Sequence, residues 1–374
     1  SSASSSSAGK LDSYAHSPIP IASLSFYPLP QSPSEHKHIS ISLPAGTFSS
    51  SSGTTQPLTP QDQLRIRSIY IKEPSLVIER GYTPLYDTLQ GSSSLALPQL
   101  SSRGSLELIV KRYADGELSR YLHRLPPGSN VEVRGPVDTW NLKRDHGEDA
   151  PVPNEIVMLV GGTGITPAYQ LLTNVLGRPS TGRINSQTTP ETKFKLVYAV
   201  PDTQNALLLP ELSRLVQAHP EQVSLTLLVE RLDHDASGRV TVPPQRPLDS
   251  SGLTLASEVR VIMASNGASR VSWNPMSWFR SASIPASAAG QGSAQDVAIQ
   301  AHQARFNPTL LQSLLAGPKP NGDQDPRYLI VLVCGPDGMV NYLAGPKSRD
   351  GRTQGPLGGL LAQLGYTQEQ VYKL

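Results

Sequence analysis

Three residues near the end of one short segment carry groups that suit a nucleotide-like cofactor. Arg80, Tyr82 and Thr83 lie close together in the sequence, and strand alternation places Arg80 and Tyr82 on the same face. A guanidinium can clamp a diphosphate with paired hydrogen bonds, an aromatic plane can support a flat heterocycle, and a small hydroxyl can bond a ring nitrogen. Taken alone, the triplet is more typical of a strand end with a solvated arginine and a half-buried tyrosine.

A second candidate for phosphate binding runs from Gly116 to Ser119, just before a segment with helical spacing. The N–H groups in the first turn of a helix have no partner within the helix and suit phosphate oxygens. Gly116 exposes the backbone here, while Leu118 and Ser119 add N–H groups and a hydroxyl. On its own, this stretch fits an ordinary capped helix better than a binding site.

A more specific glycine-rich stretch follows a continuous apolar run, Ile156 to Val160. We name it the Gly161 loop; its sequence is Gly161-Gly162-Thr163-Gly164-Ile165-Thr166-Pro167. It is not the dinucleotide fingerprint G-x-G-x-x-G, because Pro167 replaces the last glycine. It still predicts a buried strand, a glycine turn and a helix with proline near its first position. The glycines would let a cofactor's pyrophosphate or nicotinamide approach the backbone closely.

Another glycine-containing stretch also follows an apolar run, Leu329 to Val333. We name it the Cys334 loop; its sequence is Cys334-Gly335-Pro336-Asp337-Gly338-Met339. Ligands of parallel sheets bind beyond the carboxyl ends of the strands, so this loop and the Gly161 loop are expected at one edge. A single cysteine is most often a small buried apolar residue. At the start of this loop it also fits a soft group beside a redox-active ring.

The segments that must position these loops fall into two classes along the chain. Before about residue 140, apolar and polar residues alternate, as in Ile39 to Leu43 and Leu106 to Val110, which predicts short antiparallel strands. After Pro151, apolar runs such as Lys195 to Val200 alternate with helical stretches, which predicts a parallel sheet with helices on both faces. The expected fold is therefore an all-β domain followed by an α/β domain.

The domain limits follow from the same change in pattern. Residues 1–19 are a Ser-rich segment that we expect to be disordered, residues 20–150 form the first domain, and residues 151–374 form the second. An irregular insertion is expected at about residues 242–304, whose later part is rich in Ala, Ser, Gly and Gln. Because the first residue is Ser rather than Met, a targeting segment or membrane anchor before Ser1 is a further expectation.

Composition argues against several other functions. Lys and Arg total 32 against 30 Asp and Glu, a net charge of +2, which disfavours a nucleic-acid-binding protein. The single cysteine cannot form an internal disulfide or a cysteine-rich metal cluster. His36 and His38 lack companion ligands in a metal-binding pattern, so we expect them on an exposed strand and expect no metal site. The apolar runs are too short to span a bilayer.

Taken in chain order, these four motifs resemble those of the ferredoxin–NADP reductase superfamily, and the NADH–cytochrome b5 reductase branch is the most similar. The resemblance covers roughly Ser34 to Leu374, apart from the loops and the insertion. It implies a six-stranded antiparallel barrel that binds FAD, followed by an α/β domain that binds NADH or NADPH. The implied reaction is hydride transfer from NAD(P)H to flavin N5, followed by single-electron transfer to an acceptor, with no general base.

The resemblance also implies a role for each motif. Arg80 would hold the pyrophosphate, Tyr82 would lie against the flavin and ribityl chain, and Thr83 would hydrogen-bond near flavin N5. The Gly161 and Cys334 loops would place the nicotinamide over the flavin, so Thr83 and Cys334 are the implied catalytic residues. The implied cofactor-binding residues are Arg80, Tyr82, Thr83, Gly116, Leu118, Ser119, Gly161, Gly162, Thr163, Gly164, Thr166, Pro167, Cys334, Gly335, Pro336 and Met339.

Three positions depart from the family pattern. Gly81 stands where the family often has Pro, which would loosen the strand end. Asp337 replaces a common second Pro and adds charge near the nicotinamide. Asn205 stands where NADH-preferring relatives tend to carry Asp, so the repulsion of a 2′-phosphate is missing and the coenzyme preference stays open, with NADH slightly favoured.

Within the superfamily, the Ser-rich start, the run from Ile69 to Arg80 and the ending from Gln354 to Tyr366 resemble those of the fungal mitochondrial FAD reductases that support haem attachment to cytochrome c. This resemblance implies an inner-membrane location facing the intermembrane space and an acceptor that is cytochrome c, its haem lyase or a protein like cytochrome b5. Two alternatives stay open: a general cytochrome b5 reductase-like electron transferase, and a non-catalytic assembly factor that uses the flavin fold for docking. A dehydrogenase without flavin leaves the Arg80 and Gly116 motifs unexplained.

Overall fold

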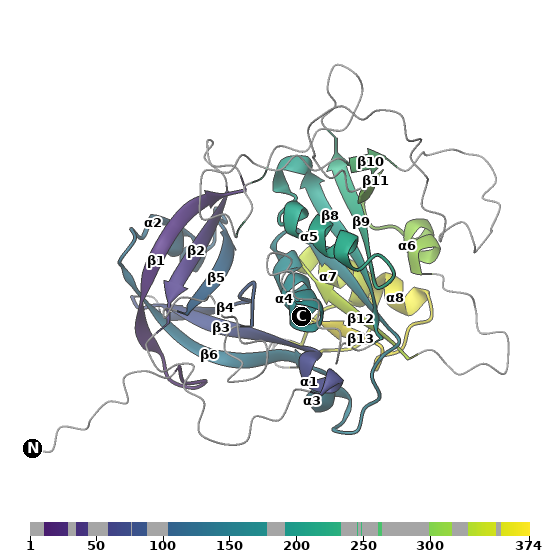
Figure 1. The fold of residues 1–374 in the computed structure, drawn as a ribbon, viewed down its shortest axis with the longest axis horizontal. Helices are drawn as coiled ribbons and strands as arrows, with labels where there is room; N and C mark the ends of the chain where they lie inside the picture. Colours follow the sequence, from purple (N-terminus) through teal and green to yellow (C-terminus); the bar gives the residue numbers. More distant parts are fainter. Residues whose placement is uncertain are drawn as a thin grey trace, which may run out of the picture.

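The structure is a computed structural model. It describes residues 11–28, 35–43, 59–75, 77–87, 104–177, 191–232, 245, 248, 261–263, 299–315, 328–348 and 353–374. Two sheets organise these residues, one antiparallel and one parallel, and they stand side by side (Figure 1).

The first sheet contains six antiparallel strands in the order β4-β3-β6-β1-β2-β5. They are β1 (Ser17–Tyr27), β2 (His36–Ser42), β3 (Arg65–Glu73), β4 (Ile78–Tyr82), β5 (Ser105–Lys111) and β6 (Asn130–Asn141). The sheet curves around an apolar core (Figure 1). Ile39 and Ile41 both point into this core because alternate residues of a strand share a face. The predicted six-stranded antiparallel domain is confirmed.

Three short helices belong to this domain: α1 (Pro60–Gln63), α2 (Glu117–Arg124) and α3 (Leu142–His146). The edge strands of the sheet are β4 and β5. Helix α2 follows β5 in the chain and lies against β4. It therefore spans the gap between the two edges and brings the Gly116 motif to the side of the sheet that carries Arg80.

The second sheet contains seven parallel strands in the order β10-β11-β9-β8-β7-β12-β13. They are β7 (Glu155–Gly161), β8 (Lys193–Asp202), β9 (Val223–Arg231), β10 (Val261–Met263), β11 (Ile299–Gln303), β12 (Leu329–Cys334) and β13 (Val371–Lys373). The central strands are buried on both faces, which explains their continuous apolar runs. The predicted α/β domain is confirmed.

Helices cover both faces of this sheet. Helices α4 (Ile165–Leu176) and α5 (Leu209–Ala218) pack on one face, with Ile156 and Met158 of β7. The other face holds α6 (Pro308–Leu315), α7 (Asp337–Ala344) and α8 (Gly359–Gln363), with Val157 and Leu159 of the same strand. Among the described helices, none is long and apolar enough to cross a bilayer.

The N-terminal expectation is corrected by the structure. Leu11 is buried in the core of the antiparallel domain, and β1 begins at Ser17, so the segment expected to be disordered up to residue 19 extends too far. Asp12 closes a turn by accepting hydrogen bonds from the N–H groups of Tyr14 and Ala15, and its carbonyl accepts from Gly135 N–H. The sequence did not predict this ordered segment, because contacts with distant residues produce no periodic pattern in so short a stretch.

The insertion expected at residues 242–304 is corrected in part. Ile299 to Gln303 form strand β11, which pairs in parallel with β9, and Val261 to Met263 form β10 beside it. Gln245 is fully buried, and its side chain binds backbone groups of Ala206 and Leu209. Short strands with Gln and His in them carry little sequence signal. The remaining residues of the insertion lie outside the described part.

The two domains share one apolar cluster. Tyr27 and Tyr86 of the first domain belong to it together with Tyr169 and Leu172 of α4. The rings of Tyr86 and Tyr169 meet edge to face with their centroids 5.8 Å apart. The N–H of Leu208 donates to the hydroxyl of Tyr27 over 3.0 Å. An extensive apolar contact holds two domains in one relative placement, whereas a small polar contact permits movement.

Candidate functional site

The Gly161 and Cys334 loops meet at one edge of the parallel sheet. Their strands are neighbours in register, with Cys334 opposite Val160. A Cβ placed on Gly164 would lie 2.7 Å from the carbonyl carbon of Cys334, and one placed on Gly161 would lie 2.5 Å from Met339 Sδ. The sequence analysis expected both loops at this edge, and the structure places them in direct contact.

Only part of the Gly161 loop is available to a ligand. Gly162 and Thr163 are partly exposed, and Gly162 has a φ of 54°, a conformation that favours glycine. Thr166 and Pro167 are buried, and the Thr166 hydroxyl donates to the carbonyl of Thr163 over 3.1 Å. Thr166 and Pro167 therefore shape the start of α4, and the turn before them supplies the surface.

Cys334 is a partly buried residue at the mouth of its loop. Burial raises the pKa of the thiol to about 11, and the nearby positive charge of Lys347 opposes the shift only weakly. The thiol is therefore protonated at neutral pH, and a protonated thiol is a poor nucleophile. In this state it offers a neutral, polarisable group next to Gly335 and Pro336.

The Arg80 side chain is exposed in the middle of β4. It donates to the carbonyl of Glu79 over 2.9 Å, and the described residues provide it with no carboxylate partner. The neighbouring carboxylate of Glu79 is bound by Arg134 with two hydrogen bonds of 2.6 and 2.9 Å and by His16 at 3.2 Å. The hydrogen bond from Arg134 is the main reason that the pKa of Glu79 is lowered. Arg80 thus remains available for an anion.

Tyr82 lies on the antiparallel core and is partly exposed. Burial raises the pKa of its phenol well above the ordinary value, so the ring stays neutral. A Cβ at the preceding Gly81 would lie 3.6 Å from the ring of Tyr70, an ordinary contact. Glycine is therefore not sterically required at position 81.

Thr83 belongs to a row of three hydroxyl groups. Its Oγ1 lies 3.0 Å from Ser68 Oγ, which lies 2.7 Å from Thr139 Oγ1. Ser68, in the middle of the row, is buried, while Thr83 at one end is partly exposed. Each hydroxyl can donate one hydrogen bond and accept others, so Thr83 keeps capacity for a ligand. Ser68 could not be identified from the sequence, because a lone serine in a strand has no distinguishing pattern.

The start of α2 offers backbone groups rather than side chains. Gly116 is the residue before the helix, and no side chain caps the first turn. Leu118 is buried in the antiparallel core, so only its backbone can face a ligand. The Ser119 hydroxyl is also buried, donating to the carbonyl of Gly116 and accepting from the N–H of Tyr113. In this structure the Ser119 hydroxyl holds its own loop together, and the expected hydroxyl contact to a diphosphate stays a prediction.

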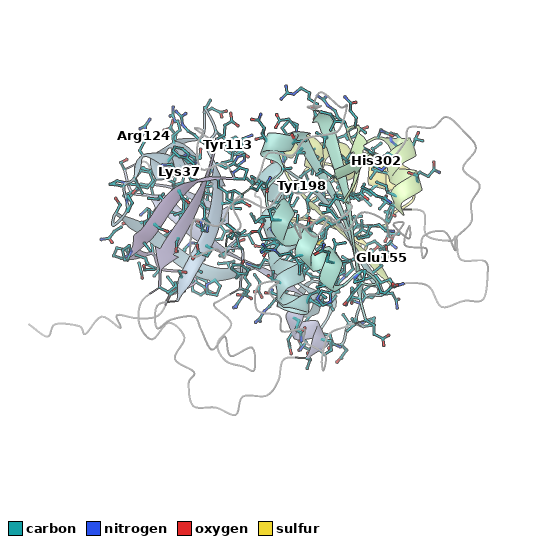
Figure 2. The ribbon with its side chains drawn as sticks, turned by 45° about the horizontal axis from the view of Figure 1, so that its top comes forward. Lys37, Tyr113, Arg124, Glu155, Tyr198 and His302 are labelled. Atoms are coloured by element: carbon teal, nitrogen blue, oxygen red, sulfur yellow. The ribbon has the colours of Figure 1, made fainter. Side chains whose placement is uncertain are left out.

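Cationic side chains surround this helix. Lys37 donates to the carbonyl of His123 in α2 over 2.8 Å, and Lys111 pairs with Glu35 at 3.3 Å. Figure 2 shows Lys37 and Arg124 on the antiparallel domain, together with the exposed ring of Tyr113. Lys37 and Arg124 therefore place positive charge beside the last turn of α2, whereas the first turn carries the acidic side chain of Glu117.

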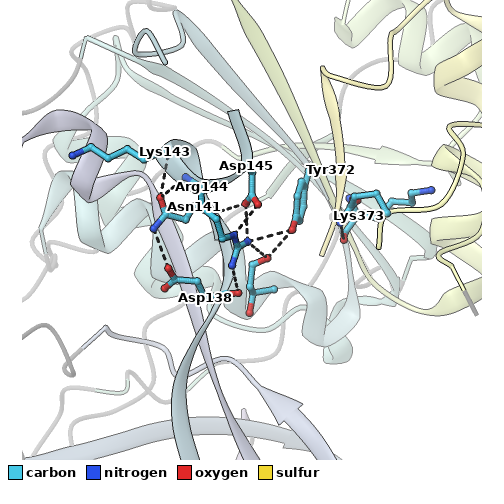
Figure 3. Close-up of polar contacts among 9 residues, drawn as sticks. Asp138, Asn141, Lys143, Arg144, Asp145, Tyr372 and Lys373 are labelled. Carbon is cyan, nitrogen blue, oxygen red and sulfur yellow. Dashed lines mark hydrogen bonds and ion pairs between the residues drawn. The ribbon is translucent and has the colours of Figure 1, made fainter. Parts of the chain in front are cut away.

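The C-terminal strand also contacts the hydroxyl row. Tyr372 of β13 donates to the carbonyl of Thr139 over 3.0 Å, and Arg144 donates to the Tyr372 hydroxyl over 3.4 Å. Arg144 is itself fixed by Asp145 and by the carbonyl of Asp138 (Figure 3). The end of the chain thus links the parallel sheet to the strand that carries Thr139.

A carboxylate stands at the carboxyl end of β8, where the sequence analysis singled out Asn205. Asp202 accepts from Asn205 N–H at 3.0 Å and from Asn205 Nδ2 at 2.7 Å. Its second oxygen pairs with Arg231 at 3.0 Å. Hydrogen bonds from Asn205 and Arg231 keep the pKa of Asp202 low against the opposing effect of burial. Negative charge is therefore present next to the neutral Asn205.

Comparison with known families identifies both halves of the chain. A model described as the oxidoreductase FAD-binding domain matches residues 92–142, and one described as the oxidoreductase NAD-binding domain matches residues 158–263. The chain therefore contains an oxidoreductase FAD-binding domain and an oxidoreductase NAD-binding domain. The resemblance expected from the four motifs is confirmed, and with it the binding domains for FAD and NAD(P)H.

The chain is similar to fungal proteins named NADH-cytochrome b5 reductase 2. The chain is 26% identical over 294 residues to NADH-cytochrome b5 reductase 2 of Neurospora crassa, covering 79% of this chain and 57% of that protein. It is also 26% identical over 294 residues to NADH-cytochrome b5 reductase 2 of Meyerozyma guilliermondii, covering 79% and 67%. The chain thus spans little more than half the length of the first relative.

Two solved structures are similar to this chain in fold. The cytochrome b5 reductase domain of Ulva prolifera nitrate reductase matches with a TM-score of 0.53 at 18% identity, over 98% of this chain and all of that one. The CS-b5R domains of human Ncb5or match with a TM-score of 0.51 at 15% identity, over 96% of this chain and 69% of that one.

The residues present fit the two cofactors. The exposed Arg80 guanidinium and the uncapped start of α2 lie on adjoining elements and suit a diphosphate. Tyr82 and Thr83 come shortly after Arg80 in the chain, and their neutral ring and hydroxyl suit a flavin ring. A Cβ on Gly164 would collide with the backbone of the Cys334 loop, so glycine is required there for the two loops to share one surface; a Cβ on Gly161 would meet only the flexible end of the Met339 side chain at such short range. Strand β5 lies against the turn Gly162–Gly164, which joins this surface to the flavin domain.

Proposed function

We propose that this protein is an FAD-dependent NAD(P)H oxidoreductase that passes electrons from the nicotinamide coenzyme through the flavin to a haem protein. One observation carries the proposal: the Gly161 and Cys334 loops touch each other, and the helix that leaves the first loop is hydrogen-bonded to Pro84, next to Thr83. The names of the fungal relatives support the same activity.

The residues divide the work between binding and orientation. Arg80 and the first turn of α2 bind the diphosphate, and Tyr82 supports the flavin ring. Thr83 donates or accepts a hydrogen bond at the ring, backed by Ser68. The two loops hold the nicotinamide and exclude water, while the protonated Cys334 thiol adds no charge beside it. Bound FAD would convert a two-electron hydride into single electrons, and the protein supplies distance and polarity.

The acceptor in this proposal is a protein of the cytochrome b5 type or a haem protein in cytochrome c maturation. The relatives' name supports the first. The resemblance of the N-terminal and C-terminal sequence to mitochondrial FAD reductases supports the second, with a location at the inner membrane facing the intermembrane space and an anchor before Ser1. The docking-module alternative does not explain why this chain places two glycine-containing loops in direct contact at the sheet edge.

The test begins with the purified protein. A bound flavin gives a yellow colour that bleaches when NADH or NADPH is added without oxygen. A protein that stays colourless after addition of FAD would contradict the proposal and favour the docking module. The reduced protein is then mixed with cytochrome b5, with cytochrome c, and with haem in the presence of apocytochrome c and its lyase. Rapid oxidation by only one of them identifies the acceptor class.

A further inference from the structure

Gln170 joins the two domains through three hydrogen bonds. It lies in the middle of α4 and is completely buried. Its Oε1 accepts from Arg67 N–H over 2.7 Å, and its Nε2 donates to the carbonyls of Arg67 over 3.0 Å and Pro84 over 2.8 Å. Both hydrogens of the amide are therefore used, and the carboxamide can adopt only this orientation.

The carboxamide replaces a missing strand neighbour. Strand β3 pairs with β4 over Ile69 to Glu73, and the pair Ile69–Tyr82 is the last one at the end nearest Arg67. Arg67 precedes this pair in β3, so no β4 residue hydrogen-bonds to its N–H or its carbonyl. Gln170 meets both, in the way a backbone amide of a neighbouring strand would. Unpaired buried backbone groups are costly, which explains why a polar residue occupies this helix position.

The backbone groups held by Gln170 are those next to the hydroxyl row. Arg67 precedes Ser68, and Pro84 follows Thr83. The Gln170 side chain therefore hydrogen-bonds to both chain segments whose hydroxyls, those of Ser68 and Thr83, lie 3.0 Å apart. On the other side, Gln170 lies one helical turn after Thr166, at the end of the Gly161 loop. Helix α4 therefore forms a short rigid link between that loop and Thr83.

We propose that Gln170 is a positioning residue that sets the placement of the nicotinamide-binding Gly161 loop relative to Thr83 on the flavin side. This inference rests on the proposed oxidoreductase function. Hydride transfer depends steeply on the separation of the reacting atoms, and a displacement of about 1 Å can slow a reaction about a hundredfold. A link fixed at three points on rigid elements restricts that separation, whereas apolar packing alone permits sliding.

Asn174 supplies a matched control. It lies one turn further along α4, and its Nδ2 donates to the carbonyl of Arg65 over 3.1 Å. It therefore also joins α4 to β3, but through one bond and farther from Thr83. Gln170→Met and Asn174→Leu each replace an amide by an apolar side chain of similar size. Both variants lose interdomain hydrogen bonds, and only the first releases Pro84 and Arg67.

The experiment compares the two variants with the wild-type holoprotein. We expect both to unfold at lower temperature and both to bind FAD. With saturating NADH and no oxygen, Gln170→Met should reduce its flavin about ten to a hundred times more slowly, with the dissociation constant for NADH little changed. The long-wavelength charge-transfer absorption of stacked nicotinamide and flavin should weaken, and the primary isotope effect with deuterated NADH should rise. Asn174→Leu should match the wild type in all three kinetic and spectroscopic readouts.

Equal reduction rates in wild type and Gln170→Met would overturn the inference, as would equal slowing in both variants. If Gln170→Met does not fold, Gln170→Asn replaces it, because the shorter amide cannot span all three partners, and the same criteria apply. A failure of the proposed function is distinguishable, since the wild-type protein would then show no flavin reduction at all.

Discussion

Gly164 and Cys334 are held in contact at the edge of the parallel sheet, although they lie on different loops. A Cβ on Gly164 would stand 2.7 Å from the carbonyl carbon of Cys334 and 2.9 Å from the N atom of Gly335. Both are backbone atoms of a loop that follows a central strand, so they cannot move aside cheaply. The absence of a side chain at position 164 is therefore what allows the two loops to form one surface.

Gly164→Ala should separate the two loops. We expect coenzyme-dependent flavin reduction to fall at least about tenfold, because the nicotinamide surface is displaced, while the FAD content stays near one per chain. Stopped-flow absorbance measures the rate. Gly338→Ala is the matched control in the Cys334 loop, since a Cβ there has no neighbour within 4 Å. Similar rates of flavin reduction in Gly164→Ala and Gly338→Ala would show that the contact between Gly164 and the Cys334 loop does not position the nicotinamide.

Arg80→Ala should abolish FAD retention. The guanidinium is exposed and has no carboxylate partner among the described residues, so its charge is available to a diphosphate. The ratio of visible to ultraviolet absorbance after gel filtration measures retention. Lys72→Ala serves as the control, because Lys72 is a cation on the neighbouring strand that already pairs with Glu132 at 3.4 Å. Full FAD retention in Arg80→Ala would exclude the assigned diphosphate site.

Thr83→Val should keep FAD and slow its reduction. The change removes the hydroxyl that faces Ser68 but keeps the shape of the side chain. A hydrogen bond to a charged group contributes about 1.5–3 kcal/mol, so a rate loss of about ten to a hundredfold is expected. Thr83→Ser, which restores a hydroxyl, should recover most of the rate in the same anaerobic assay. An unchanged rate in Thr83→Val would remove Thr83 from the reaction.

Asp202→Asn should improve the use of NADPH. Asp202 places a negative charge beside the neutral Asn205 and also holds Arg231. Removing this charge ends its repulsion of a 2′-phosphate and frees the guanidinium, so kcat/KM for NADPH should rise about tenfold while that for NADH changes little. Asn205→Asp should have the opposite effect. If the ratio of kcat/KM for NADPH to that for NADH is the same in wild type, Asp202→Asn and Asn205→Asp, the adenosine ribose does not bind beside Asp202.

Stability should fall in mildly acidic solution because of His36. Its side chain is buried, contrary to the exposed strand expected from the sequence. Burial, with the positive charge of Lys111, lowers the pKa of His36 from 6.5 to about 4 against the weaker effects of Glu35 and Asp202. Between these two pH values only the unfolded state takes up the proton, so the free energy of unfolding decreases as the pH falls, by about 3 kcal/mol in total.

Urea denaturation of wild type and His36→Gln at several pH values measures this contribution. The wild type should lose more stability than His36→Gln as the pH falls through the window from 6.5 to about 4. Other acidic groups affect both proteins alike and cancel in the comparison. If the free energy of unfolding falls equally with pH in the two proteins, the pKa of His36 is not lowered in the folded state, which would contradict the prediction.

The sequence by itself determined the two sheets and the four motifs from which the candidate site is built. Period-two alternation separated the antiparallel strands from the continuous apolar runs of the parallel sheet, because burial on one face or on both leaves a local pattern. The Gly161 and Cys334 loops follow central strands, so their meeting at one edge was also predictable. Both inferences use residues that are neighbours in the chain.

Only the tertiary structure decided what joins the domains. Gln170 and Arg67 are 103 positions apart, and Tyr27 and Leu208 are 181 apart. The burial of Leu11 and His36 depends equally on segments distant in the sequence. A hydrogen bond between residues so far apart imposes no spacing on either one, so a glutamine in an apolar helix has no recognisable pattern until the fold places a strand edge against it.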